Sequence, residues 1–278
     1  MVKIAVILTV YNRKETTLQG LRSLYKAIDV LGEEYAFDIY MTDDGCTDGT
    51  SEAVVKEFPD VHIIQGDGNL YWSGGMRKAW QAAIGSGIHY DYFLWFNDDD
   101  ELYDDALTTM IKSYNDAGGN AIVSGAFCDV EGNVSYGGRD KKCRLISPNG
   151  KLQEIFLMNG NLVLIPHIIM NTLGNIDEAF IHSLGDWDYG CRARKEHFMV
   201  LLTPVYVGKT ERHDNIPESF CNKQKSLVER LRILYSPRFS VGRLFIWEYR
   251  NIGFIRAIKS LITRHLYAIF PHIYNAFH

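Results

Sequence analysis

The amino-acid sequence predicts an α/β protein with a doubly wound, mostly parallel sheet and a helical C-terminal appendage. Short apolar runs alternate with amphipathic segments through residues 3–96, and after Pro217 the composition becomes basic and helical. The 278 residues suffice for one large domain, alone or with an appendage. The hydrophobic content of 46% and the charged content of 23% are ordinary for a globular protein, so disorder is not expected.

Apolar runs predict four strands, at residues 3–11, 37–42, 61–65 and 92–96. The first run, KIAVILTVY, is apolar almost throughout, which is typical of a strand covered on both faces. Helices are expected between these strands, at residues 16–30, at 51–58 and after Gly74-Gly75. This alternation predicts a parallel sheet with helices on both faces. The glycine-rich segment 118–150 predicts a change of topology to hairpins and loops.

The C-terminal region differs from the rest of the chain in charge. Residues 220–278 hold ten Lys or Arg against two Glu, a net charge of +8, whereas the preceding residues carry −13. Apolar residues such as Trp247, Phe254 and Leu261 are interleaved with the basic ones. Such a pattern indicates a surface that lies on an anionic membrane. It is equally typical of a helical cover packed on the main domain, and the two interpretations are compatible.

Cysteine usage and the N-terminus bear on the compartment. The five cysteines are scattered and form no C-x-x-C pair, which favours a reducing cytosol and argues against a zinc site or a disulfide framework. Met1-Val2-Lys3 leads straight into a strand-like run rather than a signal peptide, and no apolar run approaches the roughly 20 residues that span a bilayer. We expect a cytoplasmic protein, soluble or peripheral at the inner face of the cytoplasmic membrane.

An acidic run, NDDDE at residues 97–101, directly follows the apolar run at 92–96. Open α/β sheets bind ligands at the carboxyl ends of their strands. Clustered carboxylates suit Mg²⁺ or Mn²⁺, which take one or two protein carboxylates, waters and substrate phosphates as ligands. The run therefore predicts a diphosphate ligand, although acids here would also suit the start of a helix near Tyr103.

The first strand lacks the common nucleotide-binding loops. It ends in TVYNR at residues 9–13, with neither G-x-G-x-x-G nor a Walker lysine loop, so a Rossmann dehydrogenase is disfavoured. Acids instead follow the second strand, at Asp43 and Asp44, and the fourth, at Asp98 and Asp99. Carboxylates can accept hydrogen bonds from a base N–H and from ribose hydroxyls.

Eight motifs, taken in order, resemble the family-2, GT-A-type inverting glycosyltransferases, especially the rhamnosyltransferase-like members that build bacterial polysaccharides. They are TVYNR (9–13), DDGCTDGT (43–50), GNLYWSGGMRKA (68–79), NDDDEL (97–102), GN (160–161), LGNIDEAF (173–180), GDWDYGCRAR (185–194) and ERHD (211–214). The resemblance implies a Rossmann-like GT-A fold. It also implies a nucleotide-sugar-binding catalytic domain over residues 1–215 and a basic amphipathic helical region over 216–278.

The resemblance also implies a donor site. Thr9 and Asp44 would border the nucleoside base, Asp98 would lie by the ribose, and Asp99 would be the metal carboxylate of the family's D-x-D motif. Asn97 replaces the first aspartate of that motif. The remaining implied contacts to the nucleotide sugar are Tyr11, Asn12, Arg13, Asn69 and Arg77.

Several neighbouring side chains have open roles. Arg77 could offset the diphosphate charge or lie on a helix surface. Asp43 is expected to anchor a turn. Tyr71 and Trp72 could stack on the sugar or pack in the core.

Inversion at an anomeric carbon requires a base that deprotonates the acceptor hydroxyl opposite the leaving diphosphate. The resemblance implies that Asp186 is this base, with Gly185 in place of the family's usual glutamate. Asp188 and Arg192 would then support it, or form a structural salt bridge.

The resemblance also assigns one histidine. His213 matches a late histidine of the family and is an implied ligand of the metal, since imidazole binds Mn²⁺. His182 and His197 are expected to be ordinary surface or core residues.

The sequence therefore predicts a metal-dependent inverting hexosyl- or deoxyhexosyltransferase with Mn²⁺ or Mg²⁺ as cofactor. Its donor would be a UDP-, GDP- or dTDP-sugar and its acceptor a lipid-linked or polysaccharide glycan in bacterial surface glycan synthesis. Nucleic acid is not an expected partner, whereas a homo-oligomer is compatible with the sequence. The donor sugar, base, acceptor linkage and oligomeric state stay open.

Two alternatives remain. A sugar-nucleotide nucleotidyltransferase of related fold should carry a glycine-rich basic loop after the first strand, and residues 12–15 lack those glycines. A non-catalytic membrane-associated binding subunit is the other alternative. The joint presence of Asp44, Asp98, Asp99 and Asp186 argues against it.

Overall fold

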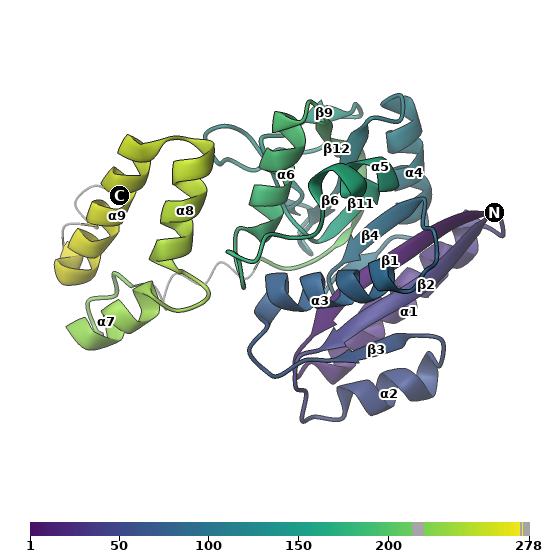
Figure 1. Cartoon of the computed structure of the whole chain (residues 1–278), viewed down its shortest axis with the longest axis horizontal. Helices are drawn as coiled ribbons and strands as arrows, with labels where there is room; N and C mark the ends of the chain where they lie inside the picture. The colour runs from purple at the N-terminus through teal and green to yellow at the C-terminus, as the bar shows by residue number, and fades with distance from the viewer. Residues whose placement is uncertain (213–219, 273, 275–278) are drawn as a thin grey trace.

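The computed structural model describes residues 1–212, 220–272 and 274. Its main body is built on a ten-stranded mixed sheet with the order β3-β2-β1-β4-β11-β6-β12-β5, to which β7 and β9 add at β6 and β12 (Figure 1). The strands of this sheet are β1 (Val2–Val10), β2 (Tyr35–Asp43), β3 (His62–Gln65), β4 (Tyr92–Phe96), β5 (Glu101–Leu102), β6 (Ala121–Cys128), β7 (Val134–Tyr136), β9 (Gln153–Glu154), β11 (Leu162–Pro166) and β12 (Met199–Lys209).

The predicted parallel half is confirmed. β1 pairs parallel with both β2 and β4, and β2 pairs parallel with β3, so the carboxyl ends of these strands meet at one edge. Helices α1 (Lys14–Leu31), α2 (Thr50–Glu57) and α4 (Ala106–Asp116) cover one face of the sheet. The helices α3 (Tyr71–Gly85), α5 (His167–Leu173) and α6 (Gly185–Lys195) cover the other.

Alternating side chains of β1 build the two apolar cores. Val6 and Leu8 pack with Leu21 of α1, whereas Ala5 and Ile7 belong to the core under α3. Because both faces are covered, the strand is apolar almost throughout, as the sequence indicated.

The change of topology expected after residue 118 is also found. β6 and β7 form an antiparallel pair, and β11 runs antiparallel to β4 with Leu162 opposite Phe96. The start of β11 therefore lies beside the end of β4, which brings Asn161 next to the acidic run; the Asn97 N–H donates to the Asn161 carbonyl at 2.9 Å. A separate two-stranded sheet pairs β8 (Gly138–Arg139) with β10 (Leu157–Met158).

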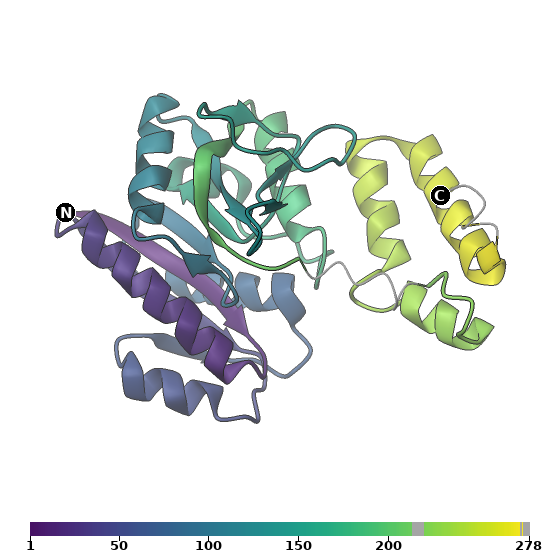
Figure 2. The same ribbon diagram turned by 180° about the vertical axis from the view of Figure 1, so that it is seen from behind.

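The C-terminal region is helical, as predicted. It consists of α7 (Leu227–Leu234), α8 (Val241–Asn251) and α9 (Phe254–Ile269), which lie together on the α6 side of the molecule, away from β3 and α2 (Figures 1 and 2). Trp247 of α8 packs against Trp187 of α6 with ring centroids 5.6 Å apart. Among the described helices, none is long and apolar enough to cross a membrane. The predicted domain boundary at 215/216 falls outside the described residues and stays a prediction.

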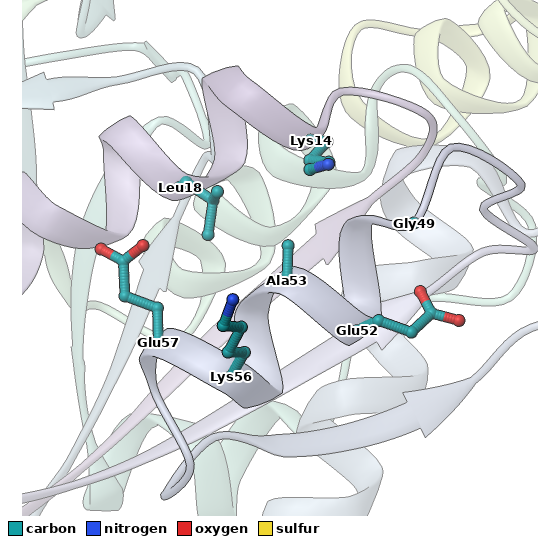
Figure 3. A pocket seen from close by; sticks show the side chains of 7 residues that line it. All are labelled: Lys14, Leu18, Gly49, Glu52, Ala53, Lys56 and Glu57. Atoms are coloured by element: carbon teal, nitrogen blue, oxygen red, sulfur yellow. The ribbon is translucent and has the colours of Figure 1, made fainter.

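A hollow of about 640 Å³ lies between α1 and α2, and Figure 3 shows the side chains that line it. Its lining combines two lysines and two glutamates with small or apolar residues, namely Lys14, Leu18, Gly49, Glu52, Ala53, Lys56 and Glu57. None of these seven residues has a role that the sequence motifs predict.

Candidate active site

A second cleft, of about 850 Å³, opens at the carboxyl ends of the parallel strands. It contains most of the side chains singled out from the sequence, together with several that were not. Its lining is formed by Thr9, Val10, Tyr11, Arg13, Asp44, Gly68, Tyr71, Trp72, Asn97, Asp99, Tyr136, Arg139, Asn159, Gly160, Asn161, His182, Ser183, Leu184, Asp186, Trp187 and Arg238.

Asp44, directly after β2, shapes the wall of this cleft. Its carboxylate accepts hydrogen bonds from the backbone N–H groups of Gly68, Leu70 and Tyr71, at 3.0, 3.2 and 2.9 Å. These bonds satisfy free N–H groups at the start of α3. They also hold Tyr71 at a positive φ of 53°, an unfavourable conformation for a bulky residue. A buried aspartate thus fixes the loop that places Tyr71 over the cleft.

Thr9 lies where β1 meets α3. Its hydroxyl donates to the Thr42 carbonyl at 3.3 Å, and a Cβ on Gly75 would overlap that hydroxyl. Glycine at position 75 therefore allows α3 to approach the end of β1 closely.

Arg13 binds two carboxylates of the acidic run. It donates to Asp98 Oδ1 at 2.6 Å and to Asp99 Oδ2 at 2.9 Å. Asp98 also accepts a hydrogen bond from the Thr17 hydroxyl at 2.8 Å and is 1% exposed, so its side chain faces α1 and does not line the cleft. Asp99 does line it, with 16% of its side chain exposed. Burial raises the pKa of Asp98 to about 6, although the Arg13 charge opposes this shift.

The neighbouring residues of the run have different surroundings. Asn97 lines the cleft and accepts a hydrogen bond from Trp72 Nε1 at 2.6 Å. Asp100 is buried and accepts one from Asn161 Nδ2 at 2.9 Å. Desolvation and the nearby Asp99 charge raise the pKa of Asp100 well above its usual value. The two residues of the run that face the cleft are therefore Asn97 and Asp99.

Asp186 lies in the first turn of α6 and lines the same cleft. Its two oxygens accept hydrogen bonds from the backbone N–H groups of Gly160, at 3.1 Å, and Trp187, at 2.9 Å. Leu184, just before the helix, has a positive φ of 74°, and a Cβ on Gly185 would lie 2.5 Å from Ser73 Oγ. Desolvation raises the pKa of Asp186 to about 6, against the opposing effect of these hydrogen bonds.

Asp188 and Arg192 form a salt bridge on α6, at 2.8 Å. Arg192 also donates to the carbonyls of Leu173, at 2.7 Å, and Asn175, at 3.0 Å. The pair therefore ties the start of α6 to the preceding loop. This agrees with the structural salt bridge, one of the two roles expected for these residues.

The turn expected around Asp43 is confirmed. Asp43 accepts hydrogen bonds from the Cys46 N–H, at 2.6 Å, and from the Ser51 hydroxyl.

Besides Asp98, three residues expected at the nucleotide sugar do not line the cleft. Asn12 accepts a hydrogen bond from the Thr47 N–H at 2.7 Å, and Asn69 is bonded within its own turn. Arg77 donates to the carbonyls of Asp177 and Phe180 at 3.3 and 3.2 Å and thereby supports the loop before α6. His213, the implied metal ligand, lies outside the described residues.

Sequence reasoning missed three cationic or ionisable side chains of the cleft. His182, expected to be an ordinary residue, lies beside Tyr71 with ring centroids 5.9 Å apart, and desolvation together with the Arg238 charge lowers its pKa. Arg139 and Arg238 also line the cleft, although neither belongs to a motif. Arg238 comes from the segment between α7 and α8, where its carbonyl accepts a hydrogen bond from the Ser183 hydroxyl at 2.7 Å. No sequence signal marks these arginines, because the tertiary fold alone brings them to the cleft.

The residues present fit a divalent ion that is completed by a substrate. Within the described ranges, no three His, Cys, Asp or Glu side chains are grouped to hold a metal. Asp99 offers one hard carboxylate ligand in the cleft wall. Mg²⁺ and Mn²⁺ sites in phosphate-transfer enzymes often use one or two carboxylates, with phosphates and waters as the other ligands. The donor set therefore suits an ion that arrives with a diphosphate.

Comparisons with known structures agree on the fold. The chain is similar to the mannosyltransferase PcManGT from Pyrobaculum calidifontis in complex with GDP-Man and Mn²⁺, with 14% identity and a TM-score of 0.54 over 94% of this chain and 73% of that one. A structure of S. aureus TarS 1-349 matches with 16% identity and a TM-score of 0.52, over 94% of this chain and 80% of that one. In another S. aureus TarS structure, the chain covers 44% of the protein, with 16% identity and a TM-score of 0.50.

A family model shows to which family the chain belongs. No curated protein matches the chain. The family model "Glycosyl transferase family 2" matches residues 5–174, which include Thr9, Asp44 and Asp99. The mixed, mostly parallel sheet with flanking helices is the GT-A-like arrangement of the similar structures. The chain therefore belongs to glycosyl transferase family 2.

Proposed function

We propose that the protein is a metal-dependent inverting glycosyltransferase that moves a sugar from a nucleoside diphosphate to an acceptor hydroxyl. One observation carries the proposal: Asp99, suited to hold a metal, and Asp186, suited to act as a base, line the same cleft. We call the part of the cleft around Thr9, Asp44 and Asp99 the donor end, and the part around Asp186 the acceptor end.

At the donor end, Thr9 and Asp44 would border the base, as the family resemblance implies. Asp99 would hold Mn²⁺ or Mg²⁺ together with the diphosphate, and the bound ion would neutralise the negative charge that grows on the leaving group. Arg13 orients Asp99 through its hydrogen bond and adds a positive charge beside it. The similar structure that contains GDP-Man and Mn²⁺ supports a nucleotide-sugar donor and a divalent ion.

At the acceptor end, Asp186 takes the proton of the attacking hydroxyl. The N–H groups of Gly160 and Trp187 hold its carboxylate in place. A pKa near 6 leaves it ionised at neutral pH and still a stronger base than an ordinary aspartate. Attack from the Asp186 side, opposite the diphosphate, inverts the configuration at the anomeric carbon.

Family membership disfavours the nucleotidyltransferase alternative, since the matching model is one of glycosyl transferases. A non-catalytic binding subunit does not require a desolvated carboxylate that can act as a base. The raised pKa of Asp186 in the cleft therefore supports an enzyme.

The acceptor proposed here is a lipid-linked or polysaccharide glycan of the bacterial surface, reached at the inner face of the membrane. α9 supports contact with a membrane, because Ile255, Ile262 and Leu266 are exposed at helical spacing, with Lys259 on the same stripe. Trp247 and Leu261 do not contribute to that face. Trp247 is 3% exposed, and Leu261 packs in the small core of the helical region.

The test is a screen of UDP-, GDP- and dTDP-sugars for thermal stabilisation of the protein with and without Mn²⁺. A ligand that binds only the folded state raises the melting temperature. The proposal predicts that at least one nucleotide sugar stabilises the protein in the presence of Mn²⁺ and does so much less with a chelator. No stabilisation by any nucleotide or nucleotide sugar would contradict it.

A further inference from the structure

Three side chains of the cleft each hold a buried polar atom that lacks a hydrogen-bond partner among the described residues. These atoms are Arg139 Nε, Asn159 Oδ1 and His182 Nδ1. An unpaired buried polar group destabilises the folded protein, so a cluster of them indicates a place where a ligand supplies the partners. At the donor end, the buried Thr9 and Asp44 side chains already have protein partners.

Arg139 and Asn159 lie next to Asp186 through the small sheet. Arg139 ends β8, which pairs with β10, and Asn159 follows β10 directly. The next residue, Gly160, donates its N–H to Asp186. In the order of the main sheet, β4 and β11 follow β1 on the side away from β2. Thr9 and Asp44 lie at the ends of β1 and β2. The unpartnered atoms of Arg139 and Asn159 thus belong to residues close to the Gly160–Asp186 hydrogen bond, at the acceptor end as defined above.

The acceptor end is also cationic. Arg139 and Arg238 line it, and within residues 1–212 and 220–272 Asp186 is the only carboxylate of the cleft lining there, since Asp44 and Asp99 belong to the donor end. The whole chain carries a net charge of −5, so the presence of two arginines around one carboxylate does not follow from a general excess of basic residues. Arg238 is held at the cleft by the Ser183 hydrogen bond to its carbonyl, which makes the C-terminal region part of the site.

We propose that the acceptor carries a phosphate or carboxylate group close to the hydroxyl that is glycosylated. This inference rests on the proposed function. One terminal nitrogen of Arg139 donates to the Cys143 carbonyl at 2.9 Å. Its Nε and remaining N–H groups would bind the anion, because the planar fork matches both oxyanions, and Arg238 would add a second positive charge. Asn159 Oδ1 would accept a hydrogen bond from a hydroxyl of the same acceptor. The two arginines would also offset the repulsion between an anionic acceptor and Asp186.

The experiment uses the full chain loaded with Mg²⁺ and whichever of UDP, GDP or dTDP binds it. Isothermal titration then measures binding of sn-glycerol 3-phosphate, glucuronate and neutral glycerol. We expect at least one anion to bind and glycerol not to bind. The anion with the higher affinity shows whether the acceptor group is a phosphate or a carboxylate. Arg139→Gln should weaken the anion about tenfold or more, with nucleotide affinity unchanged.

Arg144→Gln is the matched control. It removes the same charge at a nearby position in the chain, but Arg144 is exposed, pairs with Asp140 and does not line the cleft. If Arg139→Gln fails to fold, as judged by its melting curve, Arg238→Gln serves in its place.

The inference is overturned if neither anion binds better than glycerol, or if Arg139→Gln and Arg144→Gln behave alike. It is also overturned if Arg139→Gln weakens the nucleotide instead of the anion, because the arginine would then serve the donor. Failure of every nucleoside diphosphate to bind would contradict the proposed function instead, and the anion titrations on unloaded protein would still decide the inference.

Discussion

Arg13 donates a hydrogen bond to Asp99 across 2.9 Å, and its second terminal nitrogen binds the adjacent buried Asp98. An arginine from the loop after β1 thereby orients the carboxylate that follows β4. The two loops are joined at the position where the donor diphosphate is proposed to bind.

Asp99→Asn should abolish most metal-dependent nucleotide binding and leave the fold intact. The change removes a charged ligand in the cleft wall and no apolar packing. Mn²⁺-dependent thermal stabilisation by the nucleotide should fall to near zero, whereas Asp104→Asn, which alters an exposed pair with Lys26, should not change it. Unchanged Mn²⁺ dependence in Asp99→Asn would refute the metal assignment.

Asp186→Asn should stabilise the protein at neutral pH. A carboxyl with its pKa raised from 3.8 to about 6 in the folded state favours folding less once it ionises, so stability is lost as pH rises from about 4 to 6. The neutral amide avoids this loss, but its NH2 group cannot accept one of the two backbone hydrogen bonds. We expect a net gain of about 1–2 kcal/mol in the free energy of unfolding at pH 7.5, which disappears below about pH 4.

Denaturant unfolding at the two pH values measures this effect. Asp177→Asn is the contrasting variant, because, despite burial, hydrogen bonds from the Ala179 N–H and from Arg250 hold the pKa of Asp177 below its usual value, so the neutral amide should destabilise the protein at pH 7.5. If Asp186→Asn were as destabilising as Asp177→Asn, burial would not be the force that raises the pKa of Asp186.

Gly185→Glu, which introduces the family's usual glutamate, should destabilise this protein by about 1–3 kcal/mol. The new Cβ would meet Ser73 Oγ at 2.5 Å and Ile176 Cγ2 at 3.0 Å. Combining it with Ser73→Gly should recover part of the loss, so that the two changes are not additive. A melting temperature for Gly185→Glu equal to wild type would show that the close approach of α3 and α6 does not constrain this position.

Ile255→Ser combined with Ile262→Ser should reduce binding to anionic vesicles about tenfold or more, because the outer stripe of α9 loses apolar area. Val130→Ser, an equally exposed apolar residue on the main domain, is the control. Sedimentation with phosphatidylglycerol and phosphatidylcholine vesicles at low and high salt measures it. Equal binding to both lipids, or no effect of the double change, would favour a helical cover without a membrane.

Charge reversal at Arg250 or Arg256 is a less clean test of the membrane interpretation. Arg250 pairs with Asp177 of the main domain at 2.9 Å, and Arg256 pairs with Glu248 at 3.4 Å. Reversal would therefore disturb the packing of α8 as well as any lipid contact.

The parallel half of the fold could be predicted because its signals are local. The apolar run of β1 and the periodic leucines of α1 depend only on neighbours in the sequence. The start of α3 could not be predicted from local signals. The helix begins at Tyr71 rather than after Gly74-Gly75, because Asp44, in a distant loop, accepts hydrogen bonds from its first N–H groups.

The candidate site divides in the same way. Thr9, Asp99 and Asp186 lie in one cleft. These three residues could be predicted, because short motifs mark them at the ends of strands and helices. Arg77 is turned away by carbonyls about a hundred positions later in the chain, and the chain folds back to bring Arg139 and Arg238 to the acceptor end. Contacts of that kind leave no pattern in a single sequence.

The most direct test of the account is the single-turnover rate of transfer by Asp186→Asn with the donor already bound. The amide keeps the oxygen that can accept a backbone hydrogen bond but cannot take the proton of the acceptor. We predict donor affinity close to wild type and a transfer rate lower by about two to four orders of magnitude. A variant that retains more than about a third of the wild-type rate, with chemistry rate-limiting, would contradict the assignment of Asp186 as the base.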